Sequence, residues 1–179
     1  MPHIIDKAYT ESHKEEIIAA IKNGAIFIYP TDTIYGIGCD ATNEAAVWKL
    51  RDIKKRSDKP FSIVAPGKDW IFAHVMIPPA ELKKLPGPVT LIVNWKEGNP
   101  LSQAVNPHEI TIGIRIPDHW FSKIIEAAGL PFVTTSVNIS GEKHMESLED
   151  IPAEIRDAVD YIVYEGPKAG QSSEKIFLA

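Results

Sequence analysis

Helix-like and strand-like segments alternate along the whole chain, and this alternation limits the possible folds more than any other property of the sequence. Amphipathic patterns that predict helices occur at residues 11–24, 43–55, 118–129 and 152–159. Short apolar runs that predict strands occur at residues 25–30, 61–66, 88–95, 109–117, 131–136 and 160–166. No internal repeat or low-complexity linker interrupts them. The pattern predicts one α/β domain over residues 1–179, with functional loops at strand ends.

Charge and cysteine content exclude several classes of protein. The chain has 19 Lys and Arg residues and 24 Asp and Glu residues, a formal net charge of −5. This charge argues against general electrostatic binding of nucleic acid. Cys39 is the only cysteine, so an intramolecular disulfide and a cysteine-based zinc site are both excluded. No stretch approaches the ~18–20 apolar residues of a spanning helix, and no secretory signal is visible. We therefore expect a cytoplasmic protein that does not contact a membrane.

A basic cluster lies at the end of one predicted helix. Five cations occur within nine positions: Arg51, Lys54, Lys55, Arg56 and Lys59. The helix dipole stabilises a cation at this end by only ~0.3–1 kcal/mol, which accounts for one or two of them. The others repel one another unless an anion or a carboxylate shares the site. Arginine binds phosphate with a planar fork and lysine as a point charge, so the cluster indicates a polyphosphate site. A solvated helix face is the alternative.

Two further polar turns, at residues 31–38 and 136–141, follow predicted strands. Their polar side chains include Thr31, Thr33 and Tyr35 in the first turn and Ser136 and Asn138 in the second. Strand ends that are distant in sequence can meet at one crevice, so we expect these side chains to bind a small polar ligand. The alternative for each is a turn that bonds only to its own backbone. The glycine-rich phosphate loops GxxxxGK[ST] and GxGxxG are absent, and the six histidines lack metal-ligand spacing.

Five segments, taken in order, resemble the YrdC family of threonylcarbamoyl-AMP synthases. They are YPTDTIYGIGCDA at 29–41, DIKKRSDKPFSIV at 52–64, LPGPVTLIV at 85–93, IGIRIPDH at 112–119 and TTSVNISG at 134–141. The resemblance runs from about Ile26 to Gly141, with a weaker tail to Ser173. It implies a twisted mixed β-sheet flanked by helices, with a large basic concave cavity.

The resemblance also implies an enzyme, a nucleotidyltransferase. Such proteins combine L-threonine, bicarbonate or CO2, and ATP with its Mg2+ into threonylcarbamoyl-AMP and pyrophosphate. The product serves N6-threonylcarbamoylation of adenosine 37 in tRNA, so a downstream tRNA threonylcarbamoyl transferase is the implied partner. The implied ATP-binding residues are Lys54, Arg56, Lys59, Ser136, Asn138 and Ser173, with Lys54 and Arg56 as the catalytic cations. The implied threonine-binding residues are Thr31, Thr33, Tyr35 and Arg115. No metal site made by the protein alone is implied.

Two other functions stay open at this point. One is a module of the same fold that contacts RNA, double-stranded RNA included, against which the acidic net charge argues. The other is a diverged carbamoyl-adenylate paralogue without threonine activity, and Asn138 favours the synthase over it. The chain also departs from the family at Glu174, where threonine is usual. A carboxylate beside a phosphate is unfavourable, so we predict that Glu174 points away from the nucleotide.

Overall fold

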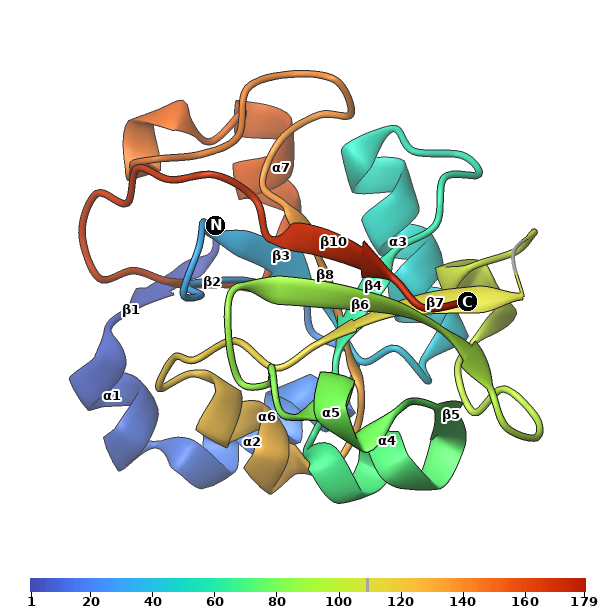
Figure 1. The fold of residues 1–179 in the computed structure, drawn as a ribbon. Coiled ribbons are helices and arrows are strands. Elements are labelled where there is room, and N and C mark those ends of the chain that lie inside the picture. The colour runs from blue at the N-terminus through green and yellow to red at the C-terminus, as the bar shows by residue number, and fades with distance from the viewer. Residues whose placement is uncertain (109) are drawn as a thin grey trace.

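A mixed β-sheet with helices on both faces forms the molecule (Figure 1), which confirms the predicted α/β class. The computed structural model describes residues 1–108 and 110–179. In that part of the chain, nine strands follow the order β1-β9-β2-β3-β8-β4-β7-β6-β10, and a tenth, β5, pairs with β6 outside this path. The strands are β1 (His3–Ile5), β2 (Phe27–Tyr29), β3 (Gly36–Gly38), β4 (Ser62–Val64), β5 (Val75–Met76), β6 (Val89–Trp95), β7 (Thr111–Arg115), β8 (Phe132–Ser136), β9 (Tyr161–Val163) and β10 (Glu174–Phe177).

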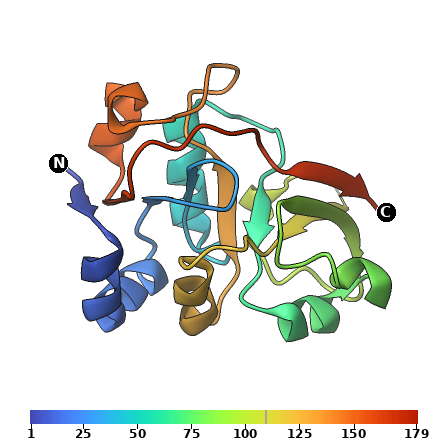
Figure 2. The ribbon, with the colours of Figure 1, turned by 60° about the vertical axis from the view of Figure 1, so that its left-hand side comes forward.

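The helices divide between the two faces of the sheet in both views (Figures 1 and 2). One face carries α1 (Lys7–Ser12), α2 (Lys14–Lys22), α4 (Lys68–His74), α5 (Pro79–Leu82) and α6 (Ser122–Ala128). The other carries α3 (Glu44–Lys54) and α7 (Ala153–Ala158). No helix in the described residues is long and apolar enough to cross a membrane.

Strand β2 shows how the sequence produces two apolar faces. Successive side chains of a strand point to opposite sides, so a fully apolar strand has to be covered on both. Phe27 and Tyr29 belong to the core cluster that contains the buried residues of α2 and α6. Ile28 belongs to the other cluster, together with Val47 and Leu50 of α3. A continuous apolar run therefore predicts this central strand correctly.

The ends of α2 and α3 follow their sequence signals. Gly24 follows α2 with φ 83°, a left-handed conformation that glycine adopts without strain. Asn43 begins α3, because its Oδ1 accepts a hydrogen bond from the Ala46 N–H at 3.1 Å. Helix α3 then ends at Lys55, whose φ of 50° turns the chain away from the helix.

Three predictions of secondary structure were wrong in detail. The helix predicted at 11–24 is interrupted at His13, because residues 11 and 12 end α1 and α2 begins at Lys14. The helix predicted to begin at Asp118 begins at Ser122, because the residues before it form tighter turns, with hydrogen bonds from the Ser122 N–H to the His119 carbonyl and from the Lys123 N–H to the Trp120 carbonyl. The turn predicted at 31–38 contains strand β3, whose pairing with β8 requires glycine at position 38: a Cβ atom there would lie 1.7 Å from the Val133 carbonyl oxygen. The strand predicted at 109–117 is found as β7, and Glu109 lies outside the described residues.

Residues 165–173, here called the strap, connect β9 to β10 and cross the sheet on the side of α3 and α7 (Figures 1 and 2). Strand β10 pairs in parallel with β6 at the sheet edge, with Glu174 opposite Val89. Gly170 of the strap approaches the 31–35 turn so closely that a Cβ atom would lie 2.7 Å from the Thr33 carbonyl oxygen. The strap and that turn are therefore packed backbone to backbone.

Candidate active site

A cavity of about 210 Å3 brings the three predicted polar turns together. It lies over the central strands, with walls from β3, β4, β6, β7, β8 and β10, and the strap contributes Ser172 and Ser173. Of the ten predicted site residues, six line it: Thr31, Tyr35, Arg56, Arg115, Ser136 and Ser173. The four that do not are Thr33, Lys54, Lys59 and Asn138. The prediction that distant strand ends converge on one crevice is thus confirmed for all three turns.

Several lining residues come from strand faces, which the sequence analysis missed. They are hydroxyl side chains at strand positions: Ser62, Thr90, Thr134 and Thr135. Thr134 and Ser136 are two residues apart on β8, so they share one side of the sheet. Hydroxyl residues within otherwise apolar strands are a signal that could have found this surface.

Three cationic side chains line the cavity: Arg56, Arg115 and Lys175. No aspartate or glutamate lines it among the described residues. Asp32, just behind the wall, lies 2.5 Å from Arg115 and offsets its charge. An excess of positive charge therefore rests on Arg56 and Lys175, and the large basic cavity implied by the resemblance stays a prediction.

Arg115 and Asp32 form a buried ion pair, with side chains 6% and 11% exposed. Arg115 Nη1 also donates to Thr33 Oγ1 at 3.3 Å. Thr33 does not line the cavity, but this hydrogen bond helps to orient the arginine. Burial lowers the pKa of Arg115, although Asp32 favours its charged form. Arg115 Nε is buried and has no partner among the described residues, an uncommon state for a polar group. Asp32 was not predicted, although its place between two threonines of a polar turn is a usable signal.

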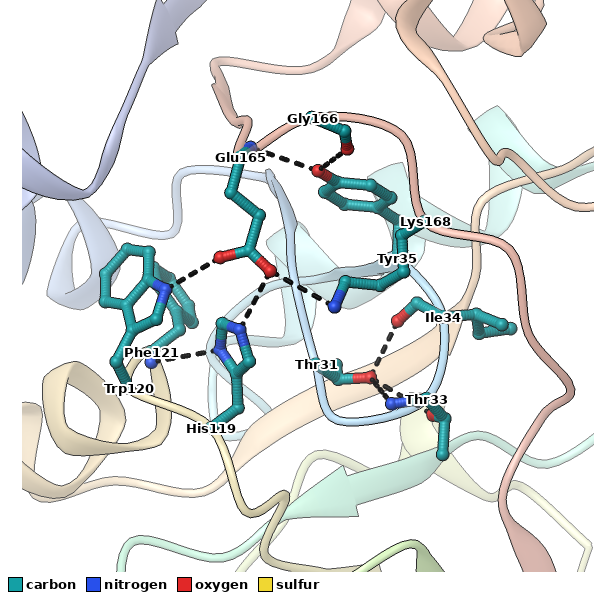
Figure 3. Close-up of polar contacts among 10 residues, drawn as sticks. All are labelled: Thr31, Thr33, Ile34, Tyr35, His119, Trp120, Phe121, Glu165, Gly166 and Lys168. Carbon is teal, nitrogen blue, oxygen red and sulfur yellow. Dashed lines mark hydrogen bonds and ion pairs between the residues drawn. The ribbon is translucent and has the colours of Figure 1, made fainter.

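The hydroxyls of the first turn are largely engaged within the protein. Thr31 Oγ1 donates to the Ile34 carbonyl at 2.7 Å and accepts from the Thr33 N–H at 3.1 Å. The Tyr35 hydroxyl donates to the Gly166 carbonyl at 2.7 Å and accepts from the Glu165 N–H at 3.0 Å (Figure 3). Burial raises the pKa of Tyr35 to about 12, so the hydroxyl keeps its proton. The turn thus bonds to its own backbone and also holds the strap over the cavity.

A second set of contacts holds the strap from its other side (Figure 3). The Glu165 carboxylate accepts hydrogen bonds from Trp120 Nε1 at 2.8 Å and His119 Nε2 at 3.0 Å, and Lys168 Nζ lies at 3.1 Å. Because His119 Nδ1 accepts from the Phe121 N–H, the imidazole proton lies on Nε2. Burial lowers the pKa of His119 despite the adjacent carboxylate, so the neutral ring is favoured. The strap is therefore fixed at Glu165 by both its backbone and its side chain.

Lys54 of the basic cluster is only 1% exposed and does not line the cavity. Its ammonium group donates to the carbonyl oxygens of Ser136 and Asn138 at 2.5 and 2.8 Å, and to Asn138 Oδ1 at 3.0 Å. These three oxygens use all three of its N–H donors. Burial, with a further contribution from the charge of Arg56, lowers the pKa of Lys54 to about 7. In this arrangement Lys54 holds the 136–138 turn, and its predicted contact with phosphate stays a prediction.

The other cations of the cluster have separate environments. Arg56 lines the cavity, and its guanidinium lies over the Phe61 ring with 5.0 Å to the centroid. Lys55 points to solvent and pairs with Glu154 at 2.6 Å, both side chains being more than half exposed. Lys59 is exposed and does not line the cavity. The polyphosphate interpretation is therefore retained for Arg56, while Lys55 fits the solvated alternative.

The third turn is held by its own side chains as well as by Lys54. The Ser136 hydroxyl donates to Asn138 Oδ1 at 2.7 Å, and Asn138 Nδ2 donates to the Glu142 carbonyl at 2.6 Å. Asn138 is 8% exposed, so its amide is occupied inside the turn. Ser136 is the member of this turn that reaches the cavity.

The last wall of the cavity comes from β10 and the residue before it. Ser173 and Lys175 line the cavity, and Glu174 between them does not. This follows from strand geometry, which sends successive side chains to opposite sides. Ser173 Oγ lies 2.6 Å from Thr90 Oγ1 of β6, which fixes the junction of the strap with β10. Lys175 was not among the predicted residues.

Metal-binding side chains do not cluster in the described part of the chain. No group of three or more His, Cys, Asp or Glu residues there is placed to hold a metal ion.

Comparison with known proteins identifies relatives over most of the chain. The family model described as "Telomere recombination", named for Sua5, YciO and YrdC, matches residues 19–177. A Methanocaldococcus jannaschii protein, provisionally named threonylcarbamoyl-AMP synthase, is 40% identical over 162 residues, covering 88% of this chain and 73% of that protein. The Bos taurus threonylcarbamoyl-AMP synthase is 34% identical over 163 residues, covering 88% of this chain and 58% of that protein.

Solved structures share the fold. A double variant of P. abyssi Sua5 matches with a TM-score of 0.88 and 25% identity, covering 100% of this chain and 54% of that chain. The same protein complexed with L-threonine gives a TM-score of 0.85 at 24% identity, covering 99% and 54%. The chain thus spans about half the length of P. abyssi Sua5. From the match over residues 19–177 and the two curated relatives, we conclude that the chain belongs to the Sua5, YciO and YrdC family.

Proposed function

We propose that this chain is a threonylcarbamoyl-AMP synthase, a nucleotidyltransferase that serves threonylcarbamoylation of tRNA. The observation that carries the proposal is the meeting of three separate polar turns and the strap on one cavity that contains Arg56 and Lys175 and no carboxylate among its described lining. The two curated relatives carry the name of this activity, and one P. abyssi Sua5 structure contains L-threonine. The substrates would be L-threonine, bicarbonate or CO2, and ATP with its Mg2+, and the product would pass to a tRNA threonylcarbamoyl transferase in the cytoplasm.

The reaction needs positioned charges and no protein nucleophile. The threonine amine takes up CO2 to form a carbamate with loss of a proton, and a carbamate oxygen then attacks the α-phosphorus. The bond from that phosphorus to the bridging oxygen breaks, and pyrophosphate leaves. Arg56 would stabilise the negative charge on the phosphates. The Ser173 hydroxyl, whose hydrogen bond with Thr90 can run in either direction, would donate a hydrogen bond to them, and Ser136 would do so after its proton leaves Asn138 Oδ1. Mg2+ bound to ATP would neutralise further phosphate charge.

Arg115 would bind the threonine carboxylate, since it is one of the three cationic residues that line the cavity. Cys39 is fully buried and burial raises the pKa of its thiol, so it takes no part as a nucleophile. The cavity of about 210 Å3 is smaller than the ~300–1,000 Å3 of typical small-molecule sites, so the adenosine would extend beyond it.

The test of the proposed function is pyrophosphate release with ATP, measured with and without bicarbonate and with three amino acids. Release should require both bicarbonate and L-threonine. Serine lacks one methyl group, which in an apolar niche such as the side chain of Ile34 is worth ~1–3 kcal/mol, so kcat/KM should fall by roughly 10- to 200-fold. The loss with 2-aminobutyrate should be greater, because the polar groups that meet the threonine hydroxyl would be left unpaired.

Three outcomes would contradict the proposed function. Equal kcat/KM for the three amino acids, or release without bicarbonate, would indicate another adenylate-forming reaction. Turnover with bicarbonate but without dependence on threonine would indicate a diverged carbamoyl-adenylate paralogue. Salt-dependent binding of duplex RNA with no ATP turnover at all would favour the RNA-binding module.

ATP binding should be accompanied by proton uptake at Lys54. The pKa of Lys54 is lowered to about 7 by burial and by the charge of Arg56, so at pH 8 roughly nine in ten of these side chains are neutral. A phosphate that neutralises Arg56 removes part of that effect and raises the pKa, so Lys54 takes up a proton. Calorimetric titration with MgATP in buffers of different ionisation enthalpy should detect this at pH 8 and not at pH 6. Persistence of the uptake in Lys54→Met would assign it to another group.

A further inference from the structure

Arg51 of α3 is a deeply buried cation near the candidate active site, and the proposed reaction gives it no role. It is 2% exposed and does not line the cavity. It forms no salt bridge in the described part of the chain, although burying an unpaired charge is costly. Burial lowers its pKa, with a smaller contribution from Arg56. A cation retained under these conditions needs compensation by hydrogen bonds.

That compensation comes entirely from backbone carbonyl groups. Toward one segment, Nε donates to the Ala104 carbonyl at 2.6 Å and Nη2 to the Val105 carbonyl at 3.1 Å. Toward the other, Nη1 lies 3.1 Å from the carbonyl oxygens of Arg56 and Lys59 and 3.4 Å from that of Ser57. One planar guanidinium therefore ties the 56–59 loop to the short helix at Gln103–Val105.

The same loop carries Arg56, the member of the basic cluster that lines the cavity among the described residues. Arg56 Nε donates to the Lys59 carbonyl at 3.2 Å, so this oxygen is shared between the two arginines. Both guanidinium groups lie against Phe61, 4.5 Å from its ring centroid for Arg51 and 5.0 Å for Arg56. The loop is thus held from the interior by Arg51 and from the cavity side by Arg56.

We propose that Arg51 is a positioning residue of the ATP site, which acts by fixing the backbone of residues 56–59 and thereby the guanidinium of Arg56. The proposal rests on the proposed function for the identity of the ligand. Lysine cannot substitute for it, because an ammonium group has three donors at one point, whereas the guanidinium fork reaches two separate segments. A shift of about 1 Å in a charged group of an active site can cost ~100-fold in rate, so a loosened loop should be visible in the kinetics.

The experiment is a double-mutant cycle with Arg51→Lys and Arg56→Met. The lysine keeps the positive charge at position 51. Arg51→Lys alone should lower kcat/KM for ATP by ~10- to 100-fold. In the Arg56→Met background the same change should cause little further loss, because the group that it positions is already absent. If the role of Arg51 is purely structural, Arg51→Lys should lower the melting temperature in both backgrounds, and the fold loss in kcat/KM should not depend on the residue at position 56. Lys55→Gln, an exposed neighbour on the same turn, is the matched control and should behave as wild type.

Wild-type kcat/KM in Arg51→Lys, or equal fold losses in both backgrounds, would overturn the proposal. If Arg51→Lys does not fold, NMR of the wild-type protein tests whether Arg51 holds the 56–59 loop in place. Slow solvent exchange of the Arg51 Nε–H and ordered amides at residues 57–59 would support the proposal, and fast exchange with mobile amides would refute it. If the wild type neither binds MgATP nor turns it over, the proposed function fails. The Arg56 Nε–H signal in Arg51→Lys then reports positioning separately: a shifted and broadened signal supports it, and an unchanged one refutes it.

Discussion

Replacing Arg56 by methionine is expected to lower kcat/KM for ATP by about 100- to 1,000-fold while the protein stays folded. Arg56 is the arginine of the basic cluster that lines the cavity, and methionine keeps apolar contact with Phe61. Loss of a charged donor to a reacting phosphate costs ~2.7–4 kcal/mol of transition-state stabilisation, which corresponds to this range. Steady-state pyrophosphate release at saturating threonine and bicarbonate measures it, with circular dichroism to confirm the fold.

Lys55→Gln is the matched control for Arg56→Met. Lys55 is the preceding residue, carries the same charge and points to solvent, where it pairs with Glu154. Its replacement should leave kcat/KM unchanged. If Arg56→Met also retained wild-type turnover, the basic cluster would not supply the phosphate-binding cation, and phosphate binding would have to be sought at Lys175.

Lys54→Met is expected to lower the free energy of unfolding by about 2–4 kcal/mol and to abolish turnover as well. The ammonium is nearly fully buried and donates to three oxygens of the 136–138 turn. Methionine fills similar space but leaves the Ser136 and Asn138 carbonyls without a donor in the interior. Urea unfolding at constant pH measures the change, and Lys55→Gln should show none that is detectable. A Lys54→Met protein of wild-type stability would mean that water or another donor replaces the ammonium.

The resemblance seen in five sequence segments is confirmed by the family match over residues 19–177. The convergence of the turns was also predictable, because apolar runs identify the strands that precede or follow them. What the sequence could not show is which cation of the cluster is buried. Arg51, Lys54 and Arg56 lie close together in the sequence. The burial of Arg51 and Lys54 depends on contacts to residues 104 and 136–138 that only the tertiary structure brings near.

The strap and β10 were not predicted for a similar reason. The segment GPKAGQSSEKIFLA lacks a long apolar run, and most of β10 is exposed. Its position is set by partners far away in the chain: the hydroxyl of Tyr35, the 31–35 turn, and strand β6. Local pattern cannot report such contacts.

The order of the strands in the sheet also affects the order in which contacts form during folding. Turn 31–35 and β10, which both line the cavity, are among the first and last parts of the described chain to be made, and β1 and β2 both pair with β9. Contacts between residues so distant in sequence form late, because the loop between them has to be closed first. The cavity is therefore complete only when these distant contacts have formed. Substrates would then recognise only the fully assembled chain and would slow its unfolding without guiding the first steps of its folding.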